Sequence, residues 1–533
     1  MIDAVPVSSV NPHAVQRSAA RAAFERLEEV FDAAFGGANN PLRHLGAMAF
    51  FFLWIVTVSG LYLYTVLDTS IVGVYSSIDW LTREQWYLGG VLRSLHRYAS
   101  DAFVLTTLLH LAREWAYGHY RGFRLYSWVT AVPLLWLMFF SGIGGYWIVW
   151  DRLAQFSAIA SAELLDWLPI FNDTIVRNFL TPESVNDRFF TMLVFIHLGV
   201  PLILILSLWA HVHRISRVDH FPARRLALGT LVALLLLAVV KPAVSDAPAD
   251  LSTVASGLRL DWFILFIHPL TDVTSRGFVW ALLFGVTALL LVLPLLPHAK
   301  AAPVAVVDAA NCNGCRRCLA DCPYAAITMG VHPYPPDGRP DREIAIVDPD
   351  LCAGCGICVG SCPSSTPFRR RKTLHSGINM PQLPIDGLRH ELEQKLARLH
   401  GATRIVVFGC DHGAGASAVE ARDTAVMSLL CTGMLPPAFV EYALRHGADG
   451  VLVAACPSGG CEFRLGERWI AERLTRQREP RLRASVPAVR LHLVFASASD
   501  GRLLARELKA FRTRLQALAA DQPLPRQRNI RHA

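Results

Sequence analysis

Apolar residues are distributed unevenly along the chain, and their pattern divides it into two halves. Four stretches contain no Asp, Glu, Lys or Arg and are long enough to cross a bilayer as helices, at 45–67, 125–150, 189–210 and 277–297. Two further stretches, 90–112 and 226–240, carry charges or are short, but have basic flanks that can extend to the interface. The pattern predicts six transmembrane helices followed by a soluble half from residue 300.

Composition agrees with a membrane protein and argues against an ordinary soluble enzyme. The 533 residues are 53% hydrophobic and 18% charged. The net charge of +8 comes from 51 basic against 43 acidic residues, an excess that helix flanks and a basic tail account for. No nucleic-acid signature is present, so we expect membrane lipid and not nucleic acid as a partner.

Basic residues at alternate helix ends predict the orientation. They precede the first helix and follow the second and fourth: Arg17, Arg21, Arg26, Arg43, Arg113, Arg121, Arg124, Arg214, Arg217, Arg224 and Arg225. By the positive-inside rule both termini are cytoplasmic. Residues 1–40 have no apolar core of signal-peptide length, and 14–35 form an amphipathic surface helix. We expect a multi-pass protein of a prokaryotic cytoplasmic membrane.

Histidines recur at the same spacing in two predicted helices. His96 and His110 lie 14 residues apart, and so do His197 and His211. Fourteen residues end about 40° short of four turns, so both histidines of a pair share one face, roughly 21 Å apart. A single intramembrane histidine is more often a packing residue, but four in matched register favour two stacked bis-His haem sites, His96 with His197 and His110 with His211. The competing ligand His213 breaks this register.

Residues 42 to about 297 resemble the cytochrome b of quinol-oxidising bc-type complexes. The resemblance lies in Arg-Ser-Leu-His at 93–96, His-Leu-Ala-Arg at 110–113 and a pair of glycines 14 residues apart in the first helix. It implies two b-type haems, with propionates paired to Arg93 and Arg113 and porphyrin rings lying against Gly46, Gly60 and Gly145. Upstream of Gly145 the sequence departs from the family, with Ala131 in place of glycine.

A partial match to the family's outer quinol site follows the fifth helix. Leu-Asp-Trp-Phe at 260–263 resembles the family's Pro-Glu-Trp-Tyr, whereas Val-Trp-Asp at 149–151 departs from its Pro-Trp-Gly. A carboxylate beside an aromatic ring can exchange a proton with a quinol, which makes Asp261 the candidate catalytic residue. The alternative is that Asp261 is a solvated loop charge beside an aromatic belt. Asp101 is a second intramembrane acid, with Arg97 as a candidate neighbour.

All 12 cysteines lie between residues 312 and 461, eight of them in two runs of spacing C-x2-C-x2-C-x3-C-P. This is the bacterial ferredoxin signature, in which the fourth cysteine of each run ligates the other cluster. One [4Fe-4S] cluster is then held by Cys312, Cys315, Cys318 and Cys362. The second is held by Cys352, Cys355, Cys358 and Cys322. Structural zinc is the alternative, and the distribution excludes a secreted disulfide framework.

Three of the other four cysteines, Cys410, Cys431 and Cys456, directly follow short apolar runs. The fourth, Cys461, lies five residues beyond Cys456. The runs 404–409, 425–430 and 450–455 alternate in part with helix-like segments, which indicates a parallel α/β fold. Because ligands bind at the carboxyl ends of such strands, these thiols predict a site for one [2Fe-2S] cluster. The alternative is that they are inert buried side chains.

Residues 402 to about 515 resemble the delta, or iron-sulfur, subunit of methyl-viologen-reducing hydrogenases. The shared stretches are 408–410, 431–433, 447–454 and 456–461. Family members usually have a second cysteine shortly after the first, where this chain has Asp-His-Gly at 411–413, so His412 is a candidate ligand if one thiol is not. The resemblance implies that electrons pass to a cytoplasmic flavoprotein or a hydrogenase-like partner.

The expected fold class is a multidomain membrane protein with three folded parts. They are a six-helix cytochrome b bundle, a ferredoxin-like α+β domain and a C-terminal α/β domain, with the boundaries 1–41, 42–220, 221–299, 300–380, 385–515 and a basic tail at 516–533. The expected function is electron transfer between quinone and the soluble partner, or else a conduit without its own quinone site. A redox sensor would need an output domain, and a homodimer is expected only by analogy with bc-type complexes.

Overall fold

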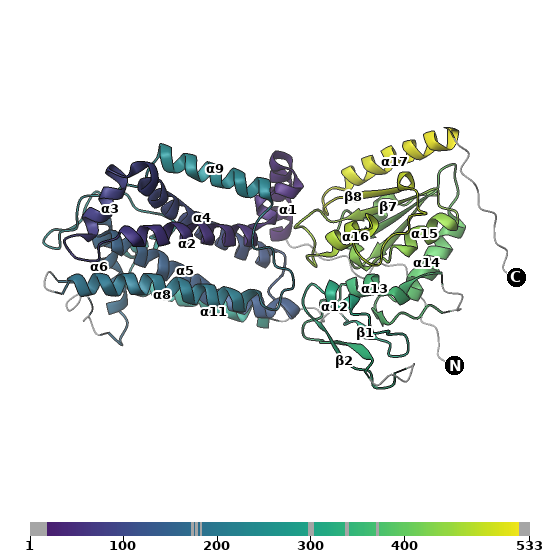
Figure 1. The fold of residues 1–533 in the computed structure, drawn as a ribbon, viewed down its shortest axis with the longest axis horizontal. Helices are drawn as coiled ribbons and strands as arrows, with labels where there is room; N and C mark the ends of the chain where they lie inside the picture. The colour runs from purple at the N-terminus through teal and green to yellow at the C-terminus, as the bar shows by residue number, and fades with distance from the viewer. Residues whose placement is uncertain are drawn as a thin grey trace. The chain divides into compact units, whose positions relative to one another are not determined.

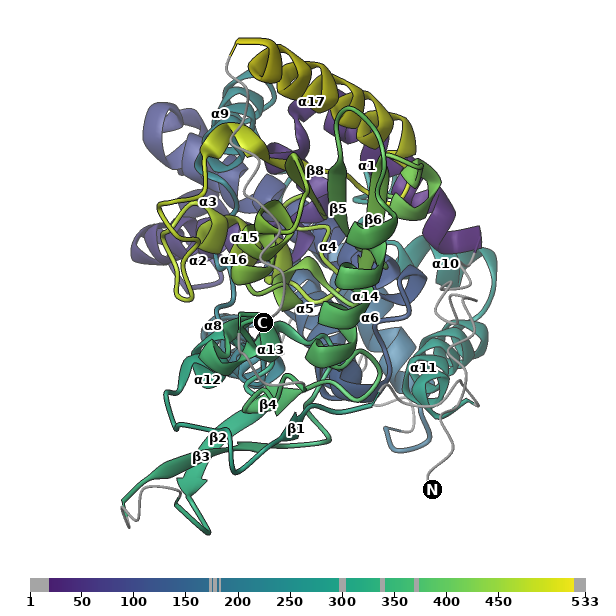
Figure 2. The ribbon, with the colours of Figure 1, turned by 90° about the vertical axis from the view of Figure 1, so that its right-hand side faces the viewer.

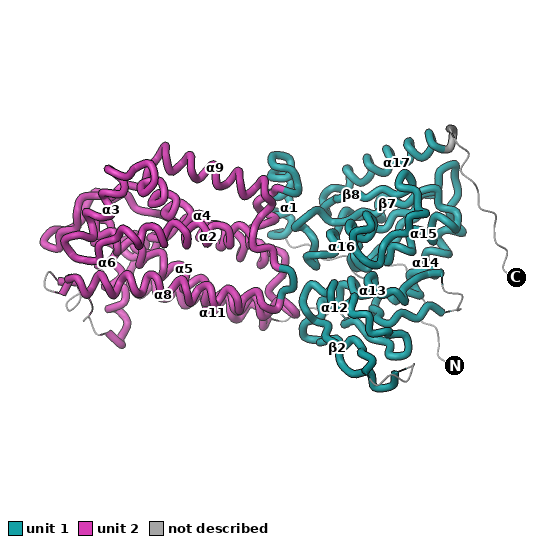
Figure 3. Tube along the Cα trace, viewed as in Figure 1, with its two compact units in different colours: residues 1–38, 215–217, 299–533 teal, residues 39–214, 218–298 magenta. Residues whose placement is uncertain are grey.

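The structure, a computed structural model, describes residues 19–171, 175, 180–181, 184–296, 303–335, 341–368 and 373–521. They fold into two compact units, one containing residues 39–214 and 218–298 and the other residues 1–38, 215–217 and 299–533 (Figures 1 and 3). The predicted surface helix is present as α1 (Ala19–Phe35). Its first residues, 14–18, and most of the predicted tail, 522–533, lie outside the described residues.

The first of these units is helical, and its six longest helices lie at the six predicted segments. They are α2 (Leu45–Val66), α4 (Val91–Ala116), α5 (Leu125–Val149), α8 (Asp187–Val212), α9 (Arg224–Val240) and α11 (Arg276–Val292). Between them are α3 (Val74–Arg83), α6 (Arg152–Asp166) and α10 (Ile267–Val273). Gly122 to Arg124 add a short helical turn before α5.

Four helices in the described part of the chain are long and apolar enough to cross a membrane: Leu45–Val66, Gly122–Val149, Asp187–Val212 and Arg276–Leu295. Large apolar side chains such as Phe195 and Leu202 point outward, 77% and 67% exposed, as expected for a surface that contacts lipid. Helix α4 is less apolar because it carries charged residues, and α9 has only 17 residues. The count of six transmembrane helices therefore stays a prediction.

Two helix pairs form the centre of the helical unit. Helix α2 packs along α4, and α5 packs along α8. Phe52 and Ala99 are buried between the first pair, and Leu134 and Leu204 between the second. The predicted glycines on α2 and α5 therefore lie beside the predicted histidines on α4 and α8.

The two cysteine runs form a small repeated structure in the second unit. Strand β2 (Ile327–Val331) pairs antiparallel with β3 (Glu343–Val347), and β1 (Val306–Val307) with β4 (Ile378–Asn379). Helix α12 (Arg317–Asp321) and helix α13 (Ile357–Ser361) occupy the same place in the two runs. The backbone is left-handed on both sides of the second cysteine in each run, at Gly314 and Arg316 and again at Gly354 and Gly356. These turns wrap each loop around its thiols.

The remainder of the second unit is a three-layer α/β structure (Figures 1 and 2). Its parallel sheet has the order β6-β5-β7-β8, formed by Thr424–Leu429, Ile405–Cys410, Gly450–Ala455 and Leu491–Phe495. Side chains alternate between two cores, so β5 and β7 are buried on both faces. Helices α14 (Ile385–Arg398), α15 (Ala438–Arg445) and α16 (Gly466–Leu474) cover one face, and α17 (Gly501–Asp521) the other. The parallel strands predicted from the apolar runs are confirmed.

Candidate metal centres

One predicted histidine pair meets inside the helical unit. The ring centroids of His96 and His197 lie 6.5 Å apart. His96 Nδ1 is 3.0 Å from the carbonyl oxygen of Val56 on α2, and His197 Nδ1 is 3.1 Å from that of Ser141 on α5. A carbonyl only accepts, so each Nδ1 carries the proton and each Nε2 keeps its lone pair for a metal.

Polar neighbours orient the other pair in a different way. His211 Nδ1 lies 3.1 Å from Thr130 Oγ1, and that hydroxyl donates its own hydrogen to the carbonyl of Tyr126. It therefore accepts from His211, which again leaves Nε2 available. His110 Nδ1 is 3.9 Å from a carboxylate oxygen of Glu114, one turn further along α4.

Glu114 is a residue that the sequence reasoning missed. Its other carboxylate oxygen accepts hydrogen bonds from His119 Nδ1 at 2.8 Å and Arg124 Nη1 at 3.1 Å. A carboxylate that orients a ligating histidine is a common feature of metal sites. Glu114 could have been identified from the sequence because it lies four residues after His110, a spacing that places both residues on one face of a helix.

Three glycines lie against these imidazoles. A Cβ added at Gly60 would lie 2.8 Å from His96 Cε1, and one at Gly145 would lie 2.8 Å from His197 Cε1. At Gly46 the nearest atom is His110 Cε1 at 3.5 Å. Real Cβ atoms do not come within 3.0 Å of other heavy atoms. His96 and His197 can therefore occupy these positions only because residues 60 and 145 are glycines.

Replacing Gly145 with alanine is expected to displace the His197 ring and lower the haem content of the purified protein. Overpacking of this kind typically costs about 1–3 kcal/mol in a packed core. The matched control is Gly144→Ala, where an added Cβ has no atom within 4 Å. A haem assay on both variants tests the expectation, which is wrong if Gly145→Ala retains as much haem as Gly144→Ala.

The two arginines expected to contact haem propionates have protein partners in this structure. Arg93 is 8% exposed and donates to Thr82 Oγ1 at 2.7 Å and to Ser245 Oγ at 2.8 Å. The guanidinium carbon of Arg113 lies 4.6 Å from the centre of the Tyr117 ring. Both side chains are buried at the ends of the α4 segment that carries the histidines.

Asp261 is buried and fully hydrogen-bonded, not a solvated loop charge. One carboxylate oxygen accepts from the backbone N–H groups of Phe263 and Ile264, at 2.6 and 3.2 Å. The other accepts from Tyr146 Oη and lies 2.7 Å from Arg97 Nη2. Since a carboxylate has about four acceptor positions, all of them are occupied.

Asp101 joins this group through an ion pair with Arg97, as the sequence suggested. One of its carboxylate oxygens is buried with no hydrogen-bond partner among the described residues. Sequence reasoning did not place Tyr146 here, and it also missed His268. The His268 side chain is 1% exposed, with Nε2 2.9 Å from Ser157 Oγ and Nδ1 without a hydrogen-bond partner in the described ranges.

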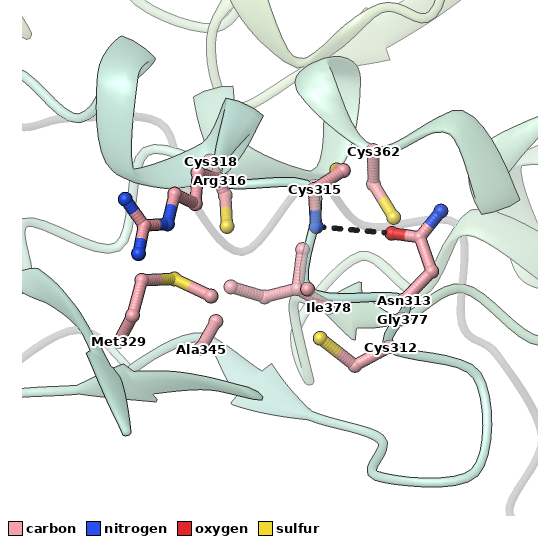
Figure 4. Close-up of a pocket in the computed structure, with 11 residues that line it drawn as sticks. Cys312, Asn313, Cys315, Arg316, Cys318, Met329, Ala345, Cys362, Gly377 and Ile378 are labelled. Atoms are coloured by element: carbon pink, nitrogen blue, oxygen red, sulfur yellow. Dashed lines mark hydrogen bonds between the residues drawn. The ribbon is translucent and has the colours of Figure 1, made fainter. Parts of the chain in front are cut away.

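A pocket lies among three thiols of the first cysteine run and one thiol of the second. Figure 4 shows the sulfur atoms of Cys312, Cys318 and Cys362 directed toward the space between them. Burial, with Cys315 and Cys362 nearby, raises the pKa of Cys318 to about 12. A bound cation would keep such a thiol deprotonated. The four thiol donors that line this pocket fit an iron-sulfur cluster.

The second thiol set is more enclosed. Burial raises the pKa of Cys355, and neighbouring thiols, among them Cys322 and Cys352, raise it further. Burial likewise raises the pKa of Cys358 well above its ordinary value. Cys322 Sγ accepts a hydrogen bond from the backbone N–H of Ala326 at 3.3 Å, an interaction that favours a thiolate. These donors also fit a cluster.

The remaining four cysteines converge at the carboxyl ends of β5, β6 and β7, and all are at most 9% exposed. Hydrogen bonds from Cys431 and Cys456 hold the pKa values of Cys410 and Cys461 well below the ordinary range. The same bonds raise the pKa values of the two donors. Two lowered and two raised pKa values that arise from shared hydrogen bonds require the four sulfur atoms to be neighbours. We call Cys410, Cys431, Cys456 and Cys461 the four-thiol site.

Two residues border the four-thiol site. At Gly466 an added Cβ would lie 2.0 Å from Cys431 Sγ, so only glycine fits at the start of α16. The His412 ring packs edge-on against Phe463, with centroids 5.3 Å apart, and its Nδ1 is 3.9 Å from Glu462. No three His, Cys, Asp or Glu side chains of the described chain are grouped as a site for a single metal ion.

Three family models match consecutive parts of the chain. Residues 37–218 match Cytochrome b/b6/petB, residues 311–366 match the 4Fe-4S dicluster domain, and residues 405–519 match the delta subunit of methyl-viologen-reducing hydrogenase. A solved structure described as "Hyperthermophilic respiratory Complex III" aligns at 18% identity and a TM-score of 0.41, over 51% of this chain and 81% of that one. The three matches support membrane electron transfer. The chain thus combines segments similar to cytochrome b, a dicluster ferredoxin and a hydrogenase delta subunit.

Proposed function

We propose that this chain is a membrane-bound electron-transfer subunit that links the quinone pool to a cytoplasmic flavoprotein or to a hydrogenase- or heterodisulfide-reductase-like partner. The observation that carries the proposal is the presence, in one chain, of paired imidazoles with available Nε2 atoms and of three separate thiol sets. Haem and iron-sulfur clusters supply one-electron redox chemistry when bound.

His96 with His197, and His110 with His211, are the residues that would hold two b-type haems in the proposed function. The Nδ1 hydrogen bonds of His96 and His197 to α2 and α5 hold each imidazole in the tautomer that iron needs. Gly46, Gly60 and Gly145 leave room beside the rings. Arg93 and Arg113, which would reach propionates, would exchange present partners for them.

The cysteines are the proposed ligands of three clusters. The set Cys312, Cys315, Cys318 and Cys362 would hold one [4Fe-4S] cluster, the set Cys322, Cys352, Cys355 and Cys358 a second, and the four-thiol site a [2Fe-2S] cluster. The pocket that places Cys362 among the thiols of the first run supports the crossed assignment. The proposed domains are a six-helix bundle in a prokaryotic cytoplasmic membrane and, on the cytoplasmic side, a ferredoxin-like domain and an α/β domain.

Quinone chemistry is proposed at Asp261. Tyr146 and Arg97 hold this buried carboxylate. Arg97 directly follows His96, and Tyr146 directly follows Gly145, which lies against His197. The second candidate function is a conduit without a quinone site, and one observation favours it: no acceptor position of Asp261 is unoccupied. A quinol would have to displace Tyr146 or Arg97 before its proton could reach the carboxylate.

Stopped-flow absorbance separates these two functions. In the purified protein, a quinol is expected to reduce haem rapidly, and Asp261→Asn is expected to slow that reduction by about 10²-fold or more, the usual contribution of a general base. The matched control is Asp272→Asn, an exposed acid in the same segment. If neither quinol nor quinone changes the haem spectrum of the native protein, the chain is a conduit and the quinone link is wrong.

A further inference from the structure

A fully buried guanidinium lies where the cysteine runs meet the four-thiol site. Arg473, on α16, is 0% exposed. Its Nη2 donates to Asp321 Oδ2 at 2.6 Å and to Ser361 Oγ at 2.7 Å, and its Nη1 donates to the carbonyl oxygen of Gly433 at 2.7 Å. Burying a charge costs several kcal/mol unless its partners are well placed, so such a residue is a poor choice for packing alone.

Each partner of Arg473 adjoins a different thiol. Asp321 immediately precedes Cys322, Ser361 immediately precedes Cys362, and Gly433 is two residues beyond Cys431. The Ser361 hydroxyl also donates to Asp321 at 2.6 Å, which joins α12 to α13. One side chain therefore connects loops that belong to all three proposed clusters.

The backbone of α13 approaches the loop after Cys431 without intervening side chains. A Cβ added at Gly360 would lie 2.3 Å from the Gly433 carbonyl oxygen and 2.6 Å from Arg473 Nη1. At Gly356 the nearest atom is Met434 Sδ, at 2.7 Å. Gly356 directly follows Cys355, and helix α13 carries Cys358, so the second thiol set lies beside the loop that follows Cys431.

The surroundings of the thiols agree with a position of the second set beside the four-thiol site. Cys461 of the four-thiol site lies within electrostatic range of Cys355 in the second set. In the first set, by contrast, Cys315 is exposed to solvent.

We propose that Arg473 is a positioning residue that fixes the three thiol-bearing loops relative to one another, and that the set Cys322, Cys352, Cys355 and Cys358 exchanges electrons directly with the four-thiol site. A single electron moves between these two centres, one being oxidised as the other is reduced. No bond forms or breaks, and no proton is needed. The set with Cys315 and Cys362 is then the solvent-facing end of the path. The inference rests on the cluster ligation proposed above.

The first test asks which [4Fe-4S] cluster is the magnetic neighbour of the four-thiol cluster. The full chain is purified in detergent and reduced, and electron paramagnetic resonance measures how fast the [2Fe-2S] signal relaxes. We expect the relaxation enhancement to be lost in Cys355→Ala and kept in Cys315→Ala. The inference is overturned if Cys315→Ala loses it and Cys355→Ala keeps it, or if neither variant changes it.

The second test addresses Arg473. Arg473→Met is expected to weaken the same magnetic interaction while the iron and labile-sulfide contents stay unchanged. The control is Arg468→Met on the same helix, whose side chain is 52% exposed and pairs with Glu472. Native relaxation in Arg473→Met would overturn the positioning role.

If Arg473→Met does not fold, Gly360→Ala takes its place, because the added Cβ must push the Gly433 carbonyl away. Its control is Gly387→Ala, where the nearest atom is 4.0 Å from the added Cβ. Magnetic coupling equal to that of the control would contradict the proposal. Native protein that contains no iron or labile sulfide would refute the proposed ligation itself, whereas clusters without mutual coupling would refute only this inference.

Discussion

Replacing His110 or His211 with leucine is expected to remove one of two haems per chain and to leave the other in place. Leucine fills a similar volume but has no lone pair for iron, so the affected site would lose one of its two ligands while the packing of the helices is kept. The second histidine pair lies on other turns of α4 and α8 and has its own polar partners. The two sites should therefore fail independently.

The measurement is a haem assay combined with reduced-minus-oxidised spectra during a potentiometric titration. Two redox components in the native protein should become one in each variant. The control is His213→Leu, since His213 is exposed at the end of α8 and stacks on Trp209 with centroids 5.5 Å apart. Retention of both haems in His110→Leu and His211→Leu would refute the ligand assignment, and loss of one in His213→Leu would move the ligand to that residue.

Replacing Cys456 with alanine is expected to abolish the [2Fe-2S] signal and to preserve both [4Fe-4S] signals. Cys456 is 3% exposed and is hydrogen-bonded to Cys410 and Cys461, so its removal opens the four-thiol site on one side. The thiols of the two cysteine runs come from other loops, so both [4Fe-4S] clusters would keep all their ligands.

Electron paramagnetic resonance of the reduced protein, with iron and labile-sulfide analysis, tests this expectation. The control is Ser458→Ala, in the same loop but without a thiol. An unchanged [2Fe-2S] signal in Cys456→Ala would show that Cys456 is not a ligand. In that case His412, which packs against Phe463 beside the site, becomes the fourth ligand to test.

Predictions that depended on local spacing succeeded best. The apolar segments give the helix positions, because a membrane-spanning helix must be apolar over its whole length. The apolar runs that end near Cys410, Cys431 and Cys456 predicted three of the four strands of the parallel sheet, since strands buried on both faces are continuous apolar runs. The 14-residue spacing predicted that His96 lies opposite His197, and the two rings do meet. The glycines beside these rings were expected from the resemblance to cytochrome b.

The surroundings of Asp261 could not be predicted in the same way. Its partners Arg97 and Tyr146 lie on α4 and α5, 164 and 115 residues away in the chain. A local motif identified the carboxylate and its aromatic neighbour but could not show that its acceptor positions are all occupied. Arg473 was missed for the same reason, because an arginine in a polar helix has no sequence feature that marks it as buried.

The sequence by itself predicted the long helices of the helical unit and three of the four strands of the parallel sheet. It also identified the histidines and cysteines that are candidate ligands and the families that the segments resemble. These depend on periodicity and spacing within a few turns, which the chain encodes locally. Only the tertiary structure decided which side chains share a site: Glu114 with His119 and Arg124, Asp261 with Arg97 and Tyr146, and Arg473 with three thiol-bearing loops. Hydrogen bonds and ion pairs act over about 3–4 Å, so distant residues acquire such partners only when packing brings their elements together.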